Sequence, residues 1–332
     1  MKKLLFICLS VFVLPLQTLM ADETAKVVVS IKPLHSLVSA VMEGVATPTL
    51  LVKKGSPHAY SLRPSEARAL ANADLVVWIG HEMESFLEKP LETVADNAKQ
   101  LELAEVLESS LLKTRNGAEW DEHEHHDEHG DEHEGDEENA THDDEHDEAH
   151  EEDDAHEEHH HGVHDMHLWL DPKMAQKVVI ESVKALIKID PAHAAQYQEN
   201  AAKLEEKLVL LDQQLVQKLT PVKTVPYLAF HSAYQYFEVA YDLNAVGSVT
   251  IDPDRKPGAK GISEIRERVK RTGARAVFSE PQFESSLVET IIEDTGAKTG
   301  VLDPLGSEIE QGPEAYFTLL NNLADNLVTG LK

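Results

Sequence analysis

Cysteine is nearly missing from this chain of 332 residues, which holds a single one, Cys8. Because Cys8 lies in an apolar N-terminal stretch that we expect to be cleaved, the mature chain can form no disulfide bond. It also has no thiolate to offer a metal ion, so any zinc site must use histidine, carboxylate or water ligands. The fold must then depend on its apolar core, and about 300 residues are enough to bury one.

Long hydrophobic runs are also missing, apart from one at the N-terminus. A positively charged start, residues 1–3, precedes an apolar stretch at 4–16, and Ala21 offers a small residue for cleavage. This layout is typical of a secretory signal peptide, so we expect residues 1–21 to direct export to the periplasm and then be removed. An uncleaved anchor is the alternative, but the stretch is short for a membrane span and no second one follows. We therefore expect a soluble mature chain with no direct membrane insertion.

Basic residues are missing from one long segment. Residues 121–165 hold 23 Asp and Glu side chains and no Lys or Arg, so they supply most of the formal net charge of −30. The rest of the chain carries 37 acidic and 30 basic residues, which leaves a net charge of −7. That balance is ordinary for a soluble domain and argues against nucleic acid or anionic lipid as a partner.

Histidine is abundant in the same acidic segment, with 13 histidines between residues 123 and 164. Because almost no apolar residue accompanies them, we expect an insertion at about residues 119–165 that is disordered when free of metal. A purely solvating acidic run is the alternative, but such a run has no need of histidine, so we interpret the insertion as a cluster of weak metal sites. Residues 156–160 also match the H-E-x-x-H pattern of zinc proteases. We attribute that match to chance, because the segment lacks the apolar periodicity of a stable helix.

Short apolar runs alternate with amphipathic stretches in the rest of the chain. This alternation predicts an α/β fold with two lobes, each a mainly parallel sheet with covering helices. We place the first lobe at residues 22–190, a long rigid bridging helix at 191–219 and the second lobe at 220–332. Within that helix four leucines at spacings of four, three and four predict one apolar stripe: Leu204, Leu208, Leu211 and Leu215. The expected strands are 27–31, 49–52, 75–79, 225–230, 276–278 and 299–302, and the expected helices are 34–42, 64–73, 172–189, 262–271 and 285–295. Ligands of such folds bind at the carboxyl ends of strands, so we expect the site in the cleft between the lobes.

Six histidines lie outside the insertion, and three of them stand at the margins of predicted strands or apolar runs: His58, His167 and His231. Zinc binds neutral imidazole nitrogens at about 2.0–2.1 Å, and three of them with one oxygen make a tetrahedral site. A single histidine at a strand end is more often only a hydrogen-bonded polar residue. We interpret the other three in such ordinary terms, His81 and His193 as surface residues and His35 as a neighbour of the cleft.

Six blocks of sequence carry a resemblance to a known family: residues 55–65, 72–78, 166–172, 230–234, 278–283 and 302–306. Together they resemble the ZnuA-type zinc-binding components of bacterial high-affinity zinc importers. The blocks come in the family's order and cover nearly all of the mature chain outside the insertion. The joint match is therefore highly specific.

The resemblance implies two α/β lobes, a rigid bridging helix and a metal ion in the cleft between the lobes. By position, His58, His167 and His231 match the three zinc-binding histidines of the family. Manganese-binding members of the wider group tend to have glutamate where His231 stands, so an imidazole there favours zinc. The implied function is that of a monomeric carrier, not an enzyme. It would capture Zn²⁺ in the periplasm and deliver it to the permease and ATPase subunit of an inner-membrane ABC importer.

Two departures from the family's pattern affect what the resemblance implies. Some zinc-binding members carry a glutamate immediately before the loop histidine, where this chain has Pro57. The fourth ligand would then be Asp303, which aligns with an aspartate ligand in other members, or a water molecule. Ala276 and Gly330 stand where some members have a disulfide, so we expect greater local mobility at the C-terminus.

Two other functions compete with transport. Three histidines with a bound water are also a catalytic arrangement, so a zinc hydrolase with Glu280 as its general base is one alternative. Hydrolysis that requires His231 would favour it. The other is a free zinc buffer that works through the insertion alone. It predicts that growth in scarce zinc survives the loss of His58.

Overall fold

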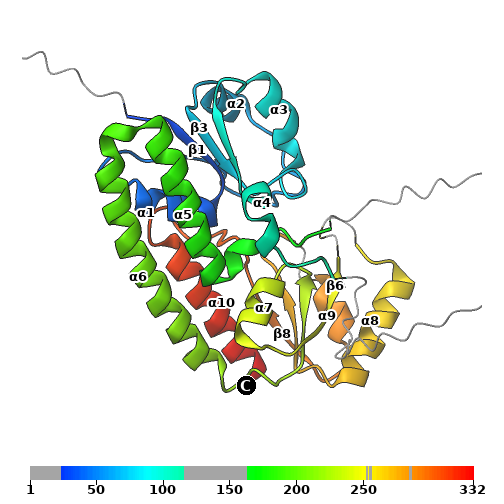
Figure 1. Ribbon diagram of the computed structural model, residues 1–332. Helices are drawn as coiled ribbons and strands as arrows, with labels where there is room; N and C mark the ends of the chain where they lie inside the picture. Colours follow the sequence, from blue (N-terminus) through cyan, green and yellow to red (C-terminus); the bar gives the residue numbers. More distant parts are fainter. Residues whose placement is uncertain (1–23, 116–162, 252, 254–255, 284–285) are drawn as a thin grey trace, which may run out of the picture.

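The computed structural model of the chain describes residues 24–115, 163–251, 253, 256–283 and 286–332. The predicted signal peptide and nearly all of the predicted insertion lie outside these residues. Within them, the chain forms two four-stranded sheets, in an upper and a lower lobe, with helices packed around them (Figure 1). All strand pairs within the two described sheets are parallel. The predicted two-lobed α/β fold is confirmed, whereas the exact lobe boundaries stay a prediction.

The first sheet has the strand order β2-β1-β3-β4. Its strands are β1 (Val27–Ile31), β2 (Thr49–Val52), β3 (Leu75–Trp78) and β4 (Lys99–Glu102). The helices around it are α1 (Lys32–Val41), α2 (Pro64–Ala71), α3 (Glu88–Thr93) and α4 (Leu103–Val106). Every residue of β1 and β3 is buried, as is usual for parallel strands covered on both faces. The apolar pattern did not indicate β4, because this edge strand reads Lys-Gln-Leu-Glu and buries only its leucine.

The second sheet repeats the arrangement with the order β6-β5-β7-β8. Its strands are β5 (Tyr227–His231), β6 (Ala245–Thr250), β7 (Ala276–Ser279) and β8 (Lys298–Val301). Its helices are α7 (Gln235–Tyr241), α8 (Ala259–Thr272), α9 (Ser286–Ile292) and α10 (Ala315–Leu331). The sequence placed the first of these strands at 225–230. In the structure it ends one residue later, because His231 still pairs with Thr250 of the neighbouring strand.

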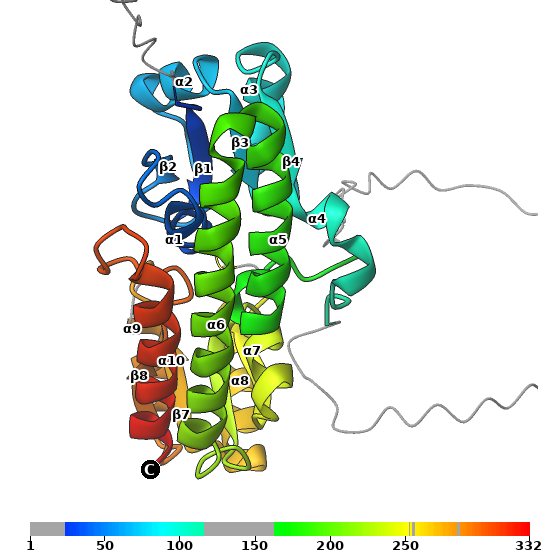
Figure 2. The same cartoon turned by 60° about the vertical axis from the view of Figure 1, so that its left-hand side comes forward.

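The long helix α6 (Ala194–Leu219) runs along both lobes, and α5 (Pro172–Ile189) lies beside its upper part, along the first lobe (Figures 1 and 2). The predicted leucine stripe of the second helix is buried at all four positions: Leu204, Leu208, Leu211 and Leu215. Helices α1 and α10 pack against α6 as well, one from each half of the fold. This helical layer joins the two sheets. None of the helices in the described part of the chain has both the length and the low polarity needed to cross a membrane.

Candidate metal centre

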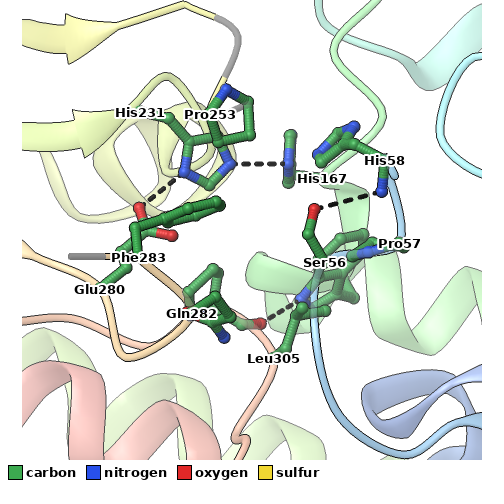
Figure 3. A pocket seen from close by; sticks show the side chains of 12 residues that line it. Ser56, Pro57, His58, His167, His231, Pro253, Glu280, Gln282, Phe283 and Leu305 are labelled. Carbon is green, nitrogen blue, oxygen red and sulfur yellow. Dashed lines mark hydrogen bonds and ion pairs between the residues drawn. The ribbon is translucent and has the colours of Figure 1, made fainter. Parts of the chain in front are cut away.

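Three imidazoles from distant parts of the chain meet in one pocket between the two sheets. One ring nitrogen from each of His58, His167 and His231 lies within 4.8 Å of the other two. The ring centroids of His167 and His231 are 5.3 Å apart, and His58 lies 5.6 Å and 6.0 Å from them. Figure 3 shows the three rings turned toward a common centre. Among the described residues, no other group of three or more His, Cys, Asp or Glu side chains has this spacing.

His58 lies in the loop between β2 and α2, which is fastened at both sides of the histidine. The Ser56 hydroxyl accepts a hydrogen bond from the His58 backbone N–H at 3.2 Å. Beyond the histidine, Glu66 accepts bonds from the Tyr60 hydroxyl at 2.9 Å and from the Arg63 backbone N–H at 2.8 Å. The second of these bonds closes a capping arrangement at the start of α2. The loop is thus tied to a helix end, although His58 as a whole residue is only partly buried.

His167 follows the end of the predicted insertion and precedes a short 3-10 turn, Leu168–Leu170. Its backbone N–H and its ring Nδ1 both bond to one oxygen of Asp165, at 2.9 Å and 2.8 Å. Behind the ring, Trp169 is fully buried and donates its indole N–H to the Pro304 carbonyl at 2.8 Å. The side chain of His167 is therefore held in one orientation by a buried carboxylate.

His231 is the last residue of β5, at the carboxyl end of a central parallel strand. Its Nδ1 bonds to Glu280 Oε1 at 2.6 Å. Glu280 directly follows the neighbouring strand β7, so the two residues meet because adjacent parallel strands end at the same edge. Both are almost wholly buried, with exposed fractions of 4 % and 2 %.

The hydrogen bonds to the two carboxylates determine which nitrogens remain for a metal. In a neutral ring, a bond from Nδ1–H to a carboxylate leaves the lone pair on Nε2. The Nε2 atoms of His167 and His231 face each other at 3.4 Å (Figure 3). Two lone pairs so oriented repel each other, and a cation between them or beside them converts that repulsion into coordination. The pair therefore fits a metal ion better than it fits a direct hydrogen bond.

Burial makes His58 a better metal ligand at mildly acidic pH. Its pKa lies well below the ordinary value of 6.5, first because burial disfavours the imidazolium and then because His167 and His231 are close by. Zinc binds only the neutral imidazole. The environment of His58 thus favours the form that binds metal.

The pocket around the triad is small and mostly apolar. It has a volume of about 10 Å³, roughly the room that one water molecule needs. Besides the histidines, it is lined by apolar groups that include Pro57, Phe283 and Leu305. A space of this size suits a single ion.

Asp303, one of the two predicted candidates for the fourth ligand, is bonded to its own loop. One carboxylate oxygen accepts bonds from Gln282 Nε2 and from the backbone N–H groups of Leu305 and Gly306, at 2.8, 3.1 and 3.0 Å. The other accepts the Ser307 N–H at 2.6 Å. Asp303 is not part of the close group that the three histidines form.

The remaining histidines lie away from the triad. The ring of His35 is buried and bonds to the Pro48 carbonyl at 3.0 Å and to the Ser39 hydroxyl at 3.4 Å. His81 is exposed beside Glu102, and His193 bonds to Asp190 at a helix junction. None belongs to a metal-spaced group in the described chain.

Sequence reasoning did not identify the carboxylates behind the two rings. Asp165 was counted as the last acidic residue of the insertion, and Glu280 was considered only as the base of a hydrolase. The sequence does carry one usable signal, because Asp165 stands two residues before His167 and a short side chain at that spacing can reach back to the ring. The contact between Glu280 and His231 depends on strand order, which the sequence alone does not provide.

Comparison with known proteins gives a consistent result. The family model of ZnuA, described as zinc-uptake complex component A, periplasmic, matches residues 27–330. A high-affinity zinc uptake system protein ZnuA from Brucella abortus (strain 2308) is 49% identical over 309 residues, covering 93% of this chain and 92% of the relative. The protein of the same name from Yersinia pestis is 36% identical over 315 residues, with coverage of 93% and 92%.

Solved structures share the fold. The structure described as "Crystal structure of ZnuA" superposes with a TM-score of 0.72 at 22% identity, covering 93% of this chain and 100% of that one. At this identity the likeness concerns the two-lobed architecture alone.

Proposed function

This chain belongs to the ZnuA family of periplasmic zinc-uptake components, and on that premise we propose that it captures Zn²⁺ in the periplasm and hands it to an ABC importer. The observation that carries the proposal is the meeting of His58, His167 and His231 within 4.8 Å in a pocket that fits one ion. Members of this family are transport components and not enzymes. We therefore infer that the pocket binds an ion for transport and does not catalyse a reaction.

The donor set favours zinc as the cargo. Three imidazole nitrogens suit a tetrahedral zinc site, whereas manganese and magnesium prefer oxygen ligands. The lack of thiolate in the described pocket excludes the soft sulfur sites that select monovalent copper. Zinc-uptake relatives at 36% and 49% identity support the same ion.

We assign the fourth position to a water molecule. For Asp303 to bind the ion, its carboxylate would have to give up bonds to Gln282 and to the backbone of its own loop. Glu280 has its Oε1 on the far nitrogen of His231, behind the ring and away from the metal side. A water molecule can bind at the open side of the triad without breaking any of these hydrogen bonds.

The partners follow from the proposed role. We infer an inner-membrane permease with its ATPase subunit as the acceptor of the zinc, export by the predicted signal peptide at residues 1–21, and action as a monomer. The predicted insertion at about 119–165 lies almost wholly outside the described residues, and its role as a cluster of weak zinc sites stays a prediction.

Zinc titration of metal-free protein against a competing chelator tests the assignment. We expect one tight site in the mature chain and also in a variant that lacks residues 121–164, which should lose only weak sites. The variants His58→Ala, His167→Ala and His231→Ala should each lose tight binding. His81→Ala is the matched control, because His81 is exposed and belongs to no metal-spaced group in the described chain, and it should bind zinc as the unaltered chain does.

Two outcomes would contradict the proposal. One is tight binding that survives all three triad substitutions, which would move the site elsewhere. The other is ester or peptide hydrolysis that depends on His231, which would favour the hydrolase. Growth in chelated medium adds a test in the cell, because the transport role requires His58 whereas a free buffer does not.

A further inference from the structure

The three histidines of the site differ in what stands behind them. Asp165 bonds to the Nδ1 of His167 at 2.8 Å, and Glu280 bonds to the Nδ1 of His231 at 2.6 Å. Both carboxylates are buried, with exposed fractions of 6 % and 2 %. The ring of His58 has no such carboxylate partner within the described chain; only its backbone N–H is bonded, to Ser56.

Asp165 is itself attached to the second lobe. Its backbone N–H bonds to the Leu112 carbonyl at 2.8 Å, and its backbone carbonyl accepts the Tyr236 hydroxyl at 2.9 Å. The same hydroxyl accepts the Leu112 N–H at 2.9 Å. Since Tyr236 lies on α7, one phenol holds both Leu112 and Asp165 against a helix that follows β5.

The chain beside Asp165 is fastened to the same helix by further contacts. Residues 112–115 pair with 163–165, through the bond from Thr114 N–H to the Val163 carbonyl at 3.0 Å and the bridge between Lys113 and His164. Gln235 donates to the Lys113 carbonyl at 3.2 Å, and the buried Glu238 pairs with Arg115. His167 is thus tied to the lobe that carries His231, although it comes before the bridging helix in the sequence.

We propose that Asp165 and Glu280 are positioning residues that hold His167 and His231 as a preformed two-histidine half-site on the second lobe, which His58 of the first lobe completes. The inference rests on the proposed zinc-binding function and adds the residues that orient two of the three ligands. Carboxylates behind a ligating histidine fix its tautomer and ring orientation, and their loss commonly weakens metal binding about 10–100-fold. Here both act on the pair whose Nε2 atoms already face each other at 3.4 Å.

The variants Asp165→Asn and Glu280→Gln test this inference, because each keeps the size of the side chain and removes its charge. We expect each to raise the zinc dissociation constant about 10–100-fold while one zinc still binds per chain. Asp190→Asn is the matched control. Asp190 also bonds to a histidine Nδ1, that of His193 at 2.8 Å, but outside the site, so this change should leave the zinc affinity unaltered.

A second measurement does not depend on the variants folding well. Long-range ¹H–¹⁵N NMR of the unaltered, metal-free protein reports which ring nitrogen carries the proton. We expect His167 and His231 to hold it on Nδ1, where Asp165 and Glu280 accept the bond.

The outcomes separate this inference from the proposed function. If the unaltered protein binds zinc tightly but both carboxylate variants match its affinity, or if the two rings carry their protons on Nε2, the half-site is wrong and zinc capture stands. If the unaltered protein has no tight zinc site, the proposed function itself fails.

Discussion

In each lobe the central strand, β1 in the first and β5 in the second, ends where the two lobes meet. In the second lobe this end carries His231, a member of the metal triad. In the first lobe the strand ends at Ile31, and the next residue, Lys32, donates to the backbone carbonyls of Gly306, Ser307 and Ile309 at 2.6, 2.9 and 2.7 Å. Equivalent positions of one strand order thus carry a residue of the candidate metal centre in one lobe and a contact between the lobes in the other.

The neighbouring strands β3 and β7 show the same division. Glu280 follows β7 and bonds to a metal-site histidine. Glu84 follows β3 by several residues and accepts the backbone N–H groups of Ile79 and Gly80, both at 3.0 Å, with no metal-spaced partner in the described chain. This strand order therefore places polar residues where the lobes meet. The type of residue determines whether it makes structural hydrogen bonds or belongs to the candidate metal centre.

Replacing Lys32 by methionine should give the largest loss of stability and would sharpen the comparison. Three carbonyls would lose a charged donor, and a hydrogen bond to a charged group contributes about 1.5–3 kcal/mol. Because water can reach some of the freed carbonyls, we expect the free energy of unfolding to fall by about 4 kcal/mol. Urea unfolding of the metal-free protein measures it. His58→Ala is the contrasting variant, since it should abolish tight zinc binding yet change the free energy of unfolding by less than about 1 kcal/mol. Equal losses of stability in the Lys32 and His58 variants would contradict the view that one residue attaches the lobes and the other binds metal.

Glu84 should make the stability of the metal-free protein fall as pH rises. Burial raises the pKa of Glu84 from 4.5 to about 7 in the folded chain. Between these values the folded chain keeps a proton that the unfolded chain has released. The stabilisation is therefore complete below the lower value and lost above about pH 7, a change of about 3 kcal/mol.

The variant Glu84→Gln isolates that contribution, because an amide does not titrate. The difference in free energy of unfolding between the two metal-free proteins should change by about 3 kcal/mol from pH 4 to pH 8. Other titrating groups cancel in this difference. Parallel curves across the range would show that folding does not raise the pKa of Glu84.

The helices that follow the two central strands, α1 and α7, end in different ways. This difference predicts a smaller loss in the free energy of unfolding than the two changes above. Asn200 of the bridging helix donates to the carbonyls of Val41 and Glu43 at the end of α1, at 2.9 and 2.8 Å. Helix α7 ends on Asp242 in the left-handed region, with φ of 52°. We expect Asn200→Ala to cost about 1–2 kcal/mol, because two terminal carbonyls lose their donor.

Asp242→Gly is the matched change at the other helix end. Glycine adopts the left-handed conformation without a steric penalty, so the free energy of unfolding should change by less than about 1 kcal/mol. Thermal or urea unfolding checks both variants. A larger loss for Asp242→Gly than for Asn200→Ala would contradict this account of the helix ends.

The sequence predicted the strands that are apolar throughout and the leucine stripe of α6, because burial on both faces or along one face leaves a direct pattern. It missed β4, whose polar edge residues give no such pattern, and β6, which contains Gly247, Ser248 and Thr250. Among the helices it missed α3, α4, α7 and α10. The three histidines were candidates from their place at strand margins, but the resemblance to a family identified them as ligands, since a single histidine at a strand end has no distinctive signature. The contacts of Glu280 and Lys32 depend on how strands and lobes come together, so no local pattern indicated them.

X-ray absorption of the zinc-loaded variant that lacks residues 121–164 tests the triad most directly, because the histidines of the insertion cannot contribute to the signal. We expect three imidazole nitrogens at about 2.0–2.1 Å and one oxygen ligand. A zinc site with fewer than three imidazoles, or with carboxylate oxygens in their place, would contradict the assignment of His58, His167 and His231.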